Sequence, residues 1–128
     1  MKNEQKHQLG WIRFDLFDTM LDNKKEDIRQ YGIYVIWHDC NVLKIGHGNM
    51  KKELARNQKD KCLLEYEKYG LHIAFAKVNP AFAKRAELYL NKLYDPEFKN
   101  EPLPDVIPAQ VTLPFSKQEL SIQLSEYD

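Results

Sequence analysis

Glu87 occupies the position in this chain that most needs a chemical explanation. It lies on a predicted helix over residues 80–94, at the border of the apolar stripe that this helix buries. A carboxylate at the border of a core is either paired with a cation or used as a metal ligand, because an unpaired charge is costly to bury. Arg85 is too close along the helix to reach it. Glu87 is therefore a candidate site residue.

Tyr34 and His47 are the next candidates, and a predicted β-hairpin carries them. Two runs rich in β-branched and aromatic residues, 32–37 and 42–46, are separated by the turn-forming residues 38–41. Tyr34 lies in the first run, which is apolar on both faces, so its hydroxyl needs a partner or solvent. His47 follows the second run, and it is either a proton-transfer group or an ordinary polar surface residue.

A basic run follows the hairpin. Asn49 can cap a helix that begins near Met50, and Gly70 fits its end. Four-residue spacing predicts a thin buried stripe of Met50, Leu54, Gln58, Cys62 and Tyr66. The side chains left exposed by that stripe are Lys51, Lys52, Arg56, Lys59 and Lys61. Such a run is either a solvated face or a surface that contacts phosphates.

The hairpin contains two triplets, Gly32-Ile33-Tyr34 and Lys44-Ile45-Gly46, with nine residues between them. This pair resembles the signature of the GIY-YIG endonuclease superfamily, although Lys44 stands where that family usually has tyrosine. The resemblance continues through a helix, a third strand and a second helix with a glutamate, and it covers about residues 31–100.

The resemblance implies a phosphodiester-hydrolysing site. By analogy with the family, Tyr34 is expected to act as the base and Glu87 to hold Mg²⁺ or Mn²⁺, while Asn100 supports the site. We therefore expect the Tyr34 hydroxyl and the Glu87 carboxylate to open into one concave site, with Asn100 at its edge.

A second departure from the family lies in the first helix. Glu53 falls where the family has a phosphate-binding arginine, and a carboxylate there repels phosphate. Arg56, Lys44 or His47 could supply the missing cation. Two hypotheses follow: a metal-dependent endonuclease, which we place slightly ahead, and a catalytically degenerate domain of the same fold that binds a protein or a nucleic acid.

The predicted fold class is α/β. The element order is strand, strand, helix, strand (71–78) and helix, which predicts a small three-stranded antiparallel sheet flanked by helices. We expect a disordered terminus over 1–9, a strand and helix extension over 10–30 that packs on the core, a GIY-YIG-like domain over 31–100, and an extended, proline-containing tail over 101–128. The helix of the extension is expected over about 15–22.

Composition narrows the function classes. The 128 residues carry no net charge, but residues 31–94 hold eleven basic and six acidic side chains, which favours nucleic acid as the partner. The resemblance to an endonuclease superfamily puts DNA first. A protein partner stays open. No apolar run reaches the roughly 18 residues of a membrane span, and no signal-peptide pattern starts the chain, so we expect a cytoplasmic protein without membrane contact. Cys40 and Cys62 predict neither a disulfide nor a zinc site.

Overall fold

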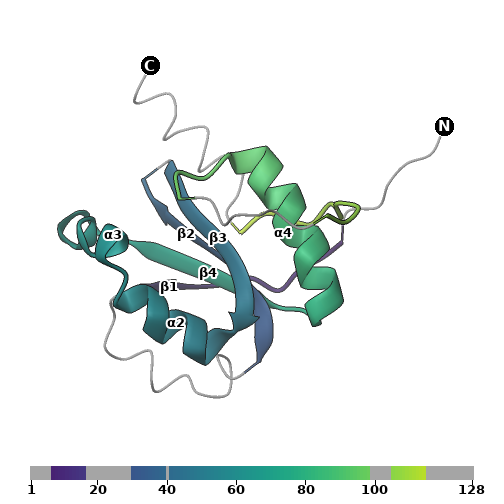
Figure 1. Ribbon diagram of the computed structural model, residues 1–128, viewed down its shortest axis with the longest axis horizontal. Helices are drawn as coiled ribbons and strands as arrows, with labels where there is room; N and C mark the ends of the chain where they lie inside the picture. The colour runs from purple at the N-terminus through teal and green to yellow at the C-terminus, as the bar shows by residue number, and fades with distance from the viewer. Residues whose placement is uncertain (1–6, 17–29, 40, 99–104, 115–128) are drawn as a thin grey trace.

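A four-stranded antiparallel sheet organises the structure, a computed structural model that describes residues 7–16, 30–39, 41–98 and 105–114 (Figure 1). Its strands are β1 (Ile12–Asp15), β2 (Tyr31–His38), β3 (Asn41–Asn49) and β4 (His72–Lys77), in the order β1-β4-β2-β3. The predicted α/β class is confirmed. The predicted number of strands was one too few, because the extension supplies β1.

Strand β1 joins the sheet through β4 and not through the hairpin. Ile12 lies opposite Phe75, and Phe14 lies opposite Ile73 and stacks on Phe75. After the strand, the amide of Leu16 donates to the carbonyl of Leu71. The predicted helix over 15–22 falls mainly outside the described residues.

The predicted hairpin of β2 and β3 is confirmed, and β2 is buried on both faces. One face of β2 carries Tyr34 and Ile36, which pack in a cluster with Met50 and Leu54. The other face carries Ile33 and Val35, which pack with Ala86 and Leu90. The helices that supply these partners, α2 (Met50–Gln58) and α4 (Pro80–Tyr94), therefore lie on opposite sides of the sheet (Figure 1).

The long helix predicted from Met50 towards Gly70 is broken into three pieces. Helix α2 ends at Gln58, α3 spans Lys61–Leu64, and a 3-10 turn, η2, spans Glu67–Tyr69. The break occurs at Asp60, whose side chain accepts from the amide of Cys62 and so caps a new helix. The predicted stripe fails beyond this break, because Cys62 is exposed and Leu63 is buried instead.

Helix α4 begins as predicted, since Asn79 accepts from the amide of Phe82 and Pro80 takes the first helical position. Its buried face includes Glu87, whereas Leu93 is 50% exposed. No helix in the described ranges is long and apolar enough to cross a membrane.

The two ends of the described chain meet beside α4. His7 and Val111 form a parallel bridge, and the indole of Trp11 donates to the carbonyl of Thr112. Residues 7–9 are thus paired with the C-terminal segment, which corrects the expectation of a disordered terminus for these three residues. The segment is tied to α4, because the amide of Ala109 donates to the carbonyl of Arg85.

Candidate functional site

The candidate site residues meet along the edge strand β3. This strand has β2 on one side, and it carries Gly46, His47 and Gly48 between α2 and α4. Tyr34 lies opposite Gly46, and Ile33 lies opposite His47, so these two pairs leave the sheet on different faces. Strand β3 therefore presents one group of side chains to α2 and another to α4 (Figure 1).

On the α2 face, Tyr34 lies directly over Gly46. A Cβ atom at Gly46 would meet the Tyr34 hydroxyl oxygen at 2.5 Å, so the motif glycine leaves the space that the ring fills. The hydroxyl donates to Glu53 Oε1 at 3.1 Å, and the Tyr34 side chain is 1% exposed. Tyr34 is therefore a buried core residue with a satisfied hydroxyl.

Glu53 holds two groups at once. Besides accepting from Tyr34, its Oε1 pairs with the guanidinium of Arg56, three residues along the same helix. Its side chain also lies against Gly48, where an added Cβ would meet Glu53 Cγ at 2.9 Å. The Glu53 carboxylate thus stands at the position where the resemblance to the family implies an arginine that holds a phosphate.

The Tyr34 hydroxyl is poorly suited to proton abstraction. Burial raises the pKa of Tyr34 well above its ordinary value; a hydrogen bond with Asn57 lowers it in part, and the negative charge of Glu53 raises it again. A phenol in this state keeps its proton at neutral pH. It can accept a proton from water only after a deprotonation that its surroundings oppose.

On the α4 face, His47 and Glu87 form a close polar contact. His47 Nδ1 lies 2.5 Å from Glu87 Oε1, and the carboxylate side chain is 3% exposed against 24% for the imidazole. Because a carboxylate accepts, Nδ1 carries the proton in this contact. The other ring nitrogen, Nε2, is left for groups outside the pair. The partner of Glu87 is thus a histidine, and not the lysine, arginine or metal ion expected from the sequence.

The expectation of one open concave site with Tyr34 and Glu87 in it is wrong. Tyr34 lies on the α2 face of the sheet, whereas Glu87 comes from α4 on the other face, and each is closed by a partner, Glu53 for the first and His47 for the second. Tyr31 is influenced by the charges on both faces. Burial raises the pKa of Tyr31, and the charges of Glu53 and Glu87 raise it further.

Lys44, which replaces the second motif tyrosine, is also held inside the molecule. Its Nζ donates to Asn57 Oδ1 at 2.7 Å and lies 3.6 Å from Asp60 Oδ2, with 14% of the side chain exposed. Asn57 is fully buried, and its amide nitrogen donates to the carbonyl of Glu53. The sequence analysis missed Tyr31, Asn57 and Asp60; the capping position of Asp60 before Lys61 was a usable signal.

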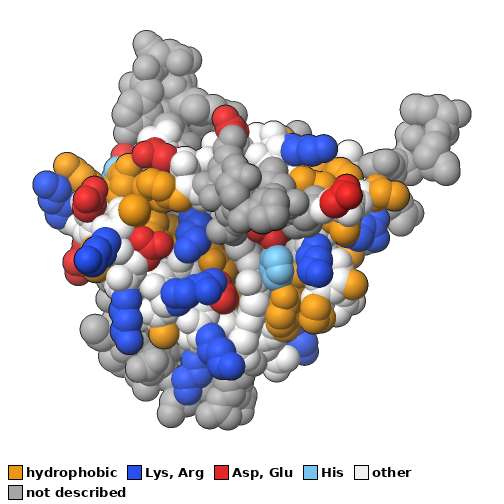
Figure 2. All heavy atoms as spheres, viewed as in Figure 1, with side chains coloured by type: hydrophobic (Ala, Val, Ile, Leu, Met, Phe, Trp, Pro, Cys, Tyr) orange, Lys and Arg blue, Asp and Glu red, His pale blue; other side chains and the backbone are white. Residues whose placement is uncertain are grey.

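The basic face of α2 is exposed as predicted. Lys51, Lys52 and Lys59 point to solvent, and the Arg56 side chain is 67% exposed although it pairs with Glu53. Figure 2 shows Lys and Arg side chains, in blue, gathered over the part of the surface where Figure 1 places α2 and α3. Asn100 lies outside the described residues.

The described side chains do not form a ready magnesium site. A divalent cation needs accessible oxygens, but Glu87 is almost fully buried and gives Oε1 to His47. No group of three or more His, Cys, Asp or Glu side chains suited to a metal ion occurs among the residues with described positions.

The arrangement places exposed positive charge on α2 and fixes the His47 ring through Nδ1. No protein family, no curated protein and no solved structure matches this chain.

Proposed function

We propose that this chain is a nucleic-acid-binding domain built on a GIY-YIG-like sheet, in which the inherited catalytic face serves as structure. The observation that carries the proposal is the contact of Tyr34 and Arg56 with Glu53. A carboxylate held between these two groups repels a phosphate at the very point where the nuclease would need to hold one.

The binding surface in this proposal is the outer face of α2. Lys51, Lys52 and Lys59 are exposed and lie within nine positions of one another, so they can neutralise successive phosphates of one backbone. Such contacts carry no base information, and the expected binding is tight at low salt and largely independent of sequence.

The test is a salt titration with a matched control. Labelled duplex DNA is titrated with wild type, with the triple variant Lys51→Gln, Lys52→Gln and Lys59→Gln, and with a control triple variant at Lys77, Lys84 and Lys92. These control lysines are also exposed but lie on β4 and α4.

The α2 variant should lower the slope of log affinity against log salt by about 2–3, because each lost phosphate contact removes roughly 0.9. The control should leave the slope unchanged. Equal losses in both variants, or none in either, would show that α2 is not the binding face.

A second candidate function, metal-dependent endonuclease activity, is favoured by the His47–Glu87 contact. A half-exposed imidazole whose Nδ1 is fixed by a buried carboxylate is suited to general-base chemistry at Nε2. In this scheme Nε2 takes a proton from water as its oxygen forms a bond to phosphorus and the bond to the leaving oxygen breaks. Glu87 acts as a positioning residue. Magnesium binding stays a prediction.

Cleavage assays separate the candidates. Supercoiled plasmid, single-stranded DNA and structured RNA are incubated with magnesium or manganese, and then with chelator. If the chain is a nuclease of this kind, His47→Gln lowers the rate by about 10²–10⁴-fold, whereas Tyr34→Phe leaves it nearly unchanged. The opposite pattern restores Tyr34 as the base. If no cleavage occurs under any of these conditions, nucleic-acid binding is the only one of the two candidate functions that remains.

A further inference from the structure

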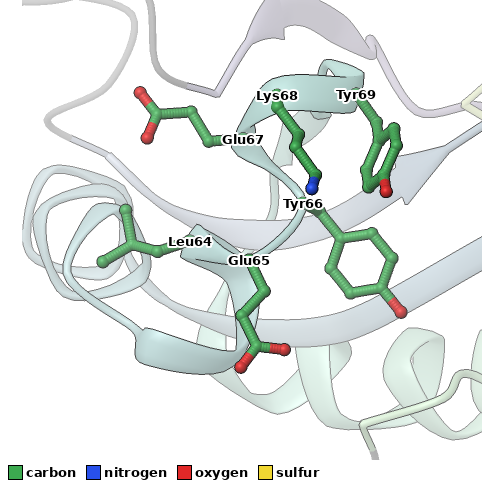
Figure 3. Close-up of a pocket in the computed structure, with 6 residues that line it drawn as sticks. All are labelled: Leu64, Glu65, Tyr66, Glu67, Lys68 and Tyr69. Atoms are coloured by element: carbon green, nitrogen blue, oxygen red, sulfur yellow. The ribbon is translucent and has the colours of Figure 1, made fainter.

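A second surface feature lies at the far end of the hairpin from the candidate site. Tyr31 and Asn49 pair at one end of β2 and β3, and His38 and Asn41 pair at the other. Beside His38, the segment 64–69 lines an open hollow of about 1030 Å³. Figure 3 shows Tyr66 and Tyr69 in this segment with the ammonium of Lys68 near them.

Aromatic rings gather around this hollow. The ring centroid of His38 lies 5.4 Å from that of Tyr69 and 5.8 Å from that of Tyr66, and the two tyrosine rings are 6.4 Å apart. Phe98 adds a fourth ring, 6.4 Å from Tyr66. Although these rings contact one another, Tyr69 is 60% exposed, so a large aromatic face is presented to solvent.

The charges around the rings are mainly negative. Glu65 and Glu67 belong to the segment itself, Glu97 Oε2 lies 3.4 Å from the Tyr66 hydroxyl, and Asp39 Oδ2 lies 3.3 Å from His38 Nε2. Lys68 is the cation that the hollow itself contains. Its Nζ lies 5.1 Å from the centroid of the Tyr69 ring, within the range of a cation–π contact.

From these contacts we propose that the hollow binds a basic polypeptide segment of a partner protein, with an arginine or lysine side chain over the Tyr69 ring. The faces of aromatic rings attract cations, and the surrounding carboxylates add a long-range attraction for a chain of positive charge. Lys68 already makes such a contact from within the molecule, so it competes with the incoming cation. The site lies apart from α2, and the proposal does not rest on nucleic-acid binding.

A nucleic acid is the other class of ligand that exposed tyrosines can bind, since bases stack on aromatic faces. The carboxylates of Glu97 and Asp39 beside these rings oppose it, because the phosphate backbone would be brought close to them. Lys68 distinguishes the two classes of ligand, because its positive charge repels a basic peptide and attracts a phosphate.

The test uses a fluorescein-labelled peptide of alternating glycine and arginine, and a control peptide with glutamine in place of arginine. Fluorescence anisotropy is measured with wild type, Tyr69→Phe and Tyr69→Ala at low salt. The arginine peptide should bind and the glutamine peptide should not. Tyr69→Phe keeps the ring and should bind as wild type does, whereas Tyr69→Ala should bind about two- to fivefold more weakly.

Lys68→Gln gives the decisive result. It should strengthen binding of the arginine peptide, whereas weaker binding of a single-stranded oligonucleotide together with weaker binding of the peptide would assign the hollow to nucleic acid. Circular dichroism of each variant confirms that the fold is kept, which the exposure of both side chains favours. The proposal is overturned if Tyr69→Ala binds the peptide as well as wild type does, if Lys68→Gln weakens peptide binding, or if the glutamine peptide binds equally.

Discussion

Substitution of Gly46 by alanine tests the packing on which the candidate site depends. The added Cβ would lie 2.5 Å from the Tyr34 hydroxyl oxygen, 2.7 Å from Cζ and 3.0 Å from Cε2. These distances are shorter than real Cβ contacts, so the ring has to move. Tyr34 is 1% exposed and packs among buried residues, which leaves it no room to move without cost.

The expected magnitude follows from overpacking of a core, which costs about 1–3 kcal/mol. Loss of the hydrogen bond from Tyr34 to Glu53 adds about 1 kcal/mol if the ring turns away. With a urea m value of about 1.5 kcal/mol/M, the midpoint of unfolding falls by about 1–2.5 M. Urea titration followed by circular dichroism measures this shift directly.

Gly10→Ala is the matched control, because a Cβ at Gly10 has nothing within 4 Å. It should leave the midpoint unchanged or raise it slightly. Tyr34→Phe should not rescue Gly46→Ala, since the clash with the ring carbons stays. If Gly46→Ala and Gly10→Ala unfold at the same urea concentration, the ring does not lie over Gly46 and the account of the motif glycine is wrong.

Three further predictions concern the same region. Gly32→Ala would place a Cβ 2.4 Å from the backbone oxygen of Ala76, so it should cost at least about 2 kcal/mol in urea unfolding, and a stable variant would contradict the pairing of β2 with β4. Glu53→Gln removes the charge beside Arg56 and should raise DNA affinity about two- to fivefold in anisotropy titrations; unchanged affinity would mean that phosphates do not approach this point. Burial raises the pKa of Tyr34 above its ordinary value of 10.0, so the unfolded chain releases this proton first. The free energy of unfolding should therefore fall as the pH rises above about 10, and Tyr34→Phe should make that fall shallower.

The parts of the fold that the sequence predicts are those with local signals. Two apolar runs around a turn predict the hairpin, and Asn79 and Pro80 predict the start of α4. Strand β1 has only four residues, and its partner β4 lies about 60 positions further on, so its pairing has no local signal. The break before α3 did have a local signal, the capping residue Asp60, but no glycine or proline marks the break.

The candidate site was predictable in its residues more than in its contacts. The sequence analysis required a partner for Glu87 and for the Tyr34 hydroxyl, and both have one. The partners themselves depend on tertiary structure. His47 is 40 positions from Glu87, and Glu53 reaches Tyr34 only because α2 packs on that face of the sheet. Glu87 is buried, although its spacing predicted only a position at the border of the core. The depth at which α4 packs on the sheet decides this, and helical periodicity does not predict that depth.

The pairing of the two ends of the described chain has a consequence for the order of folding. Hydrogen bonds from Leu9 and Trp11 to Thr112 join residues 103 and 101 positions apart. Closing a loop of that length in an open chain costs about 4 kcal/mol of entropy, which these few bonds do not offset. The ends can pair at low cost only after the sheet and α4 have brought them together. Residues 7–11 and 109–112 should therefore form a late unit of folding that also opens first.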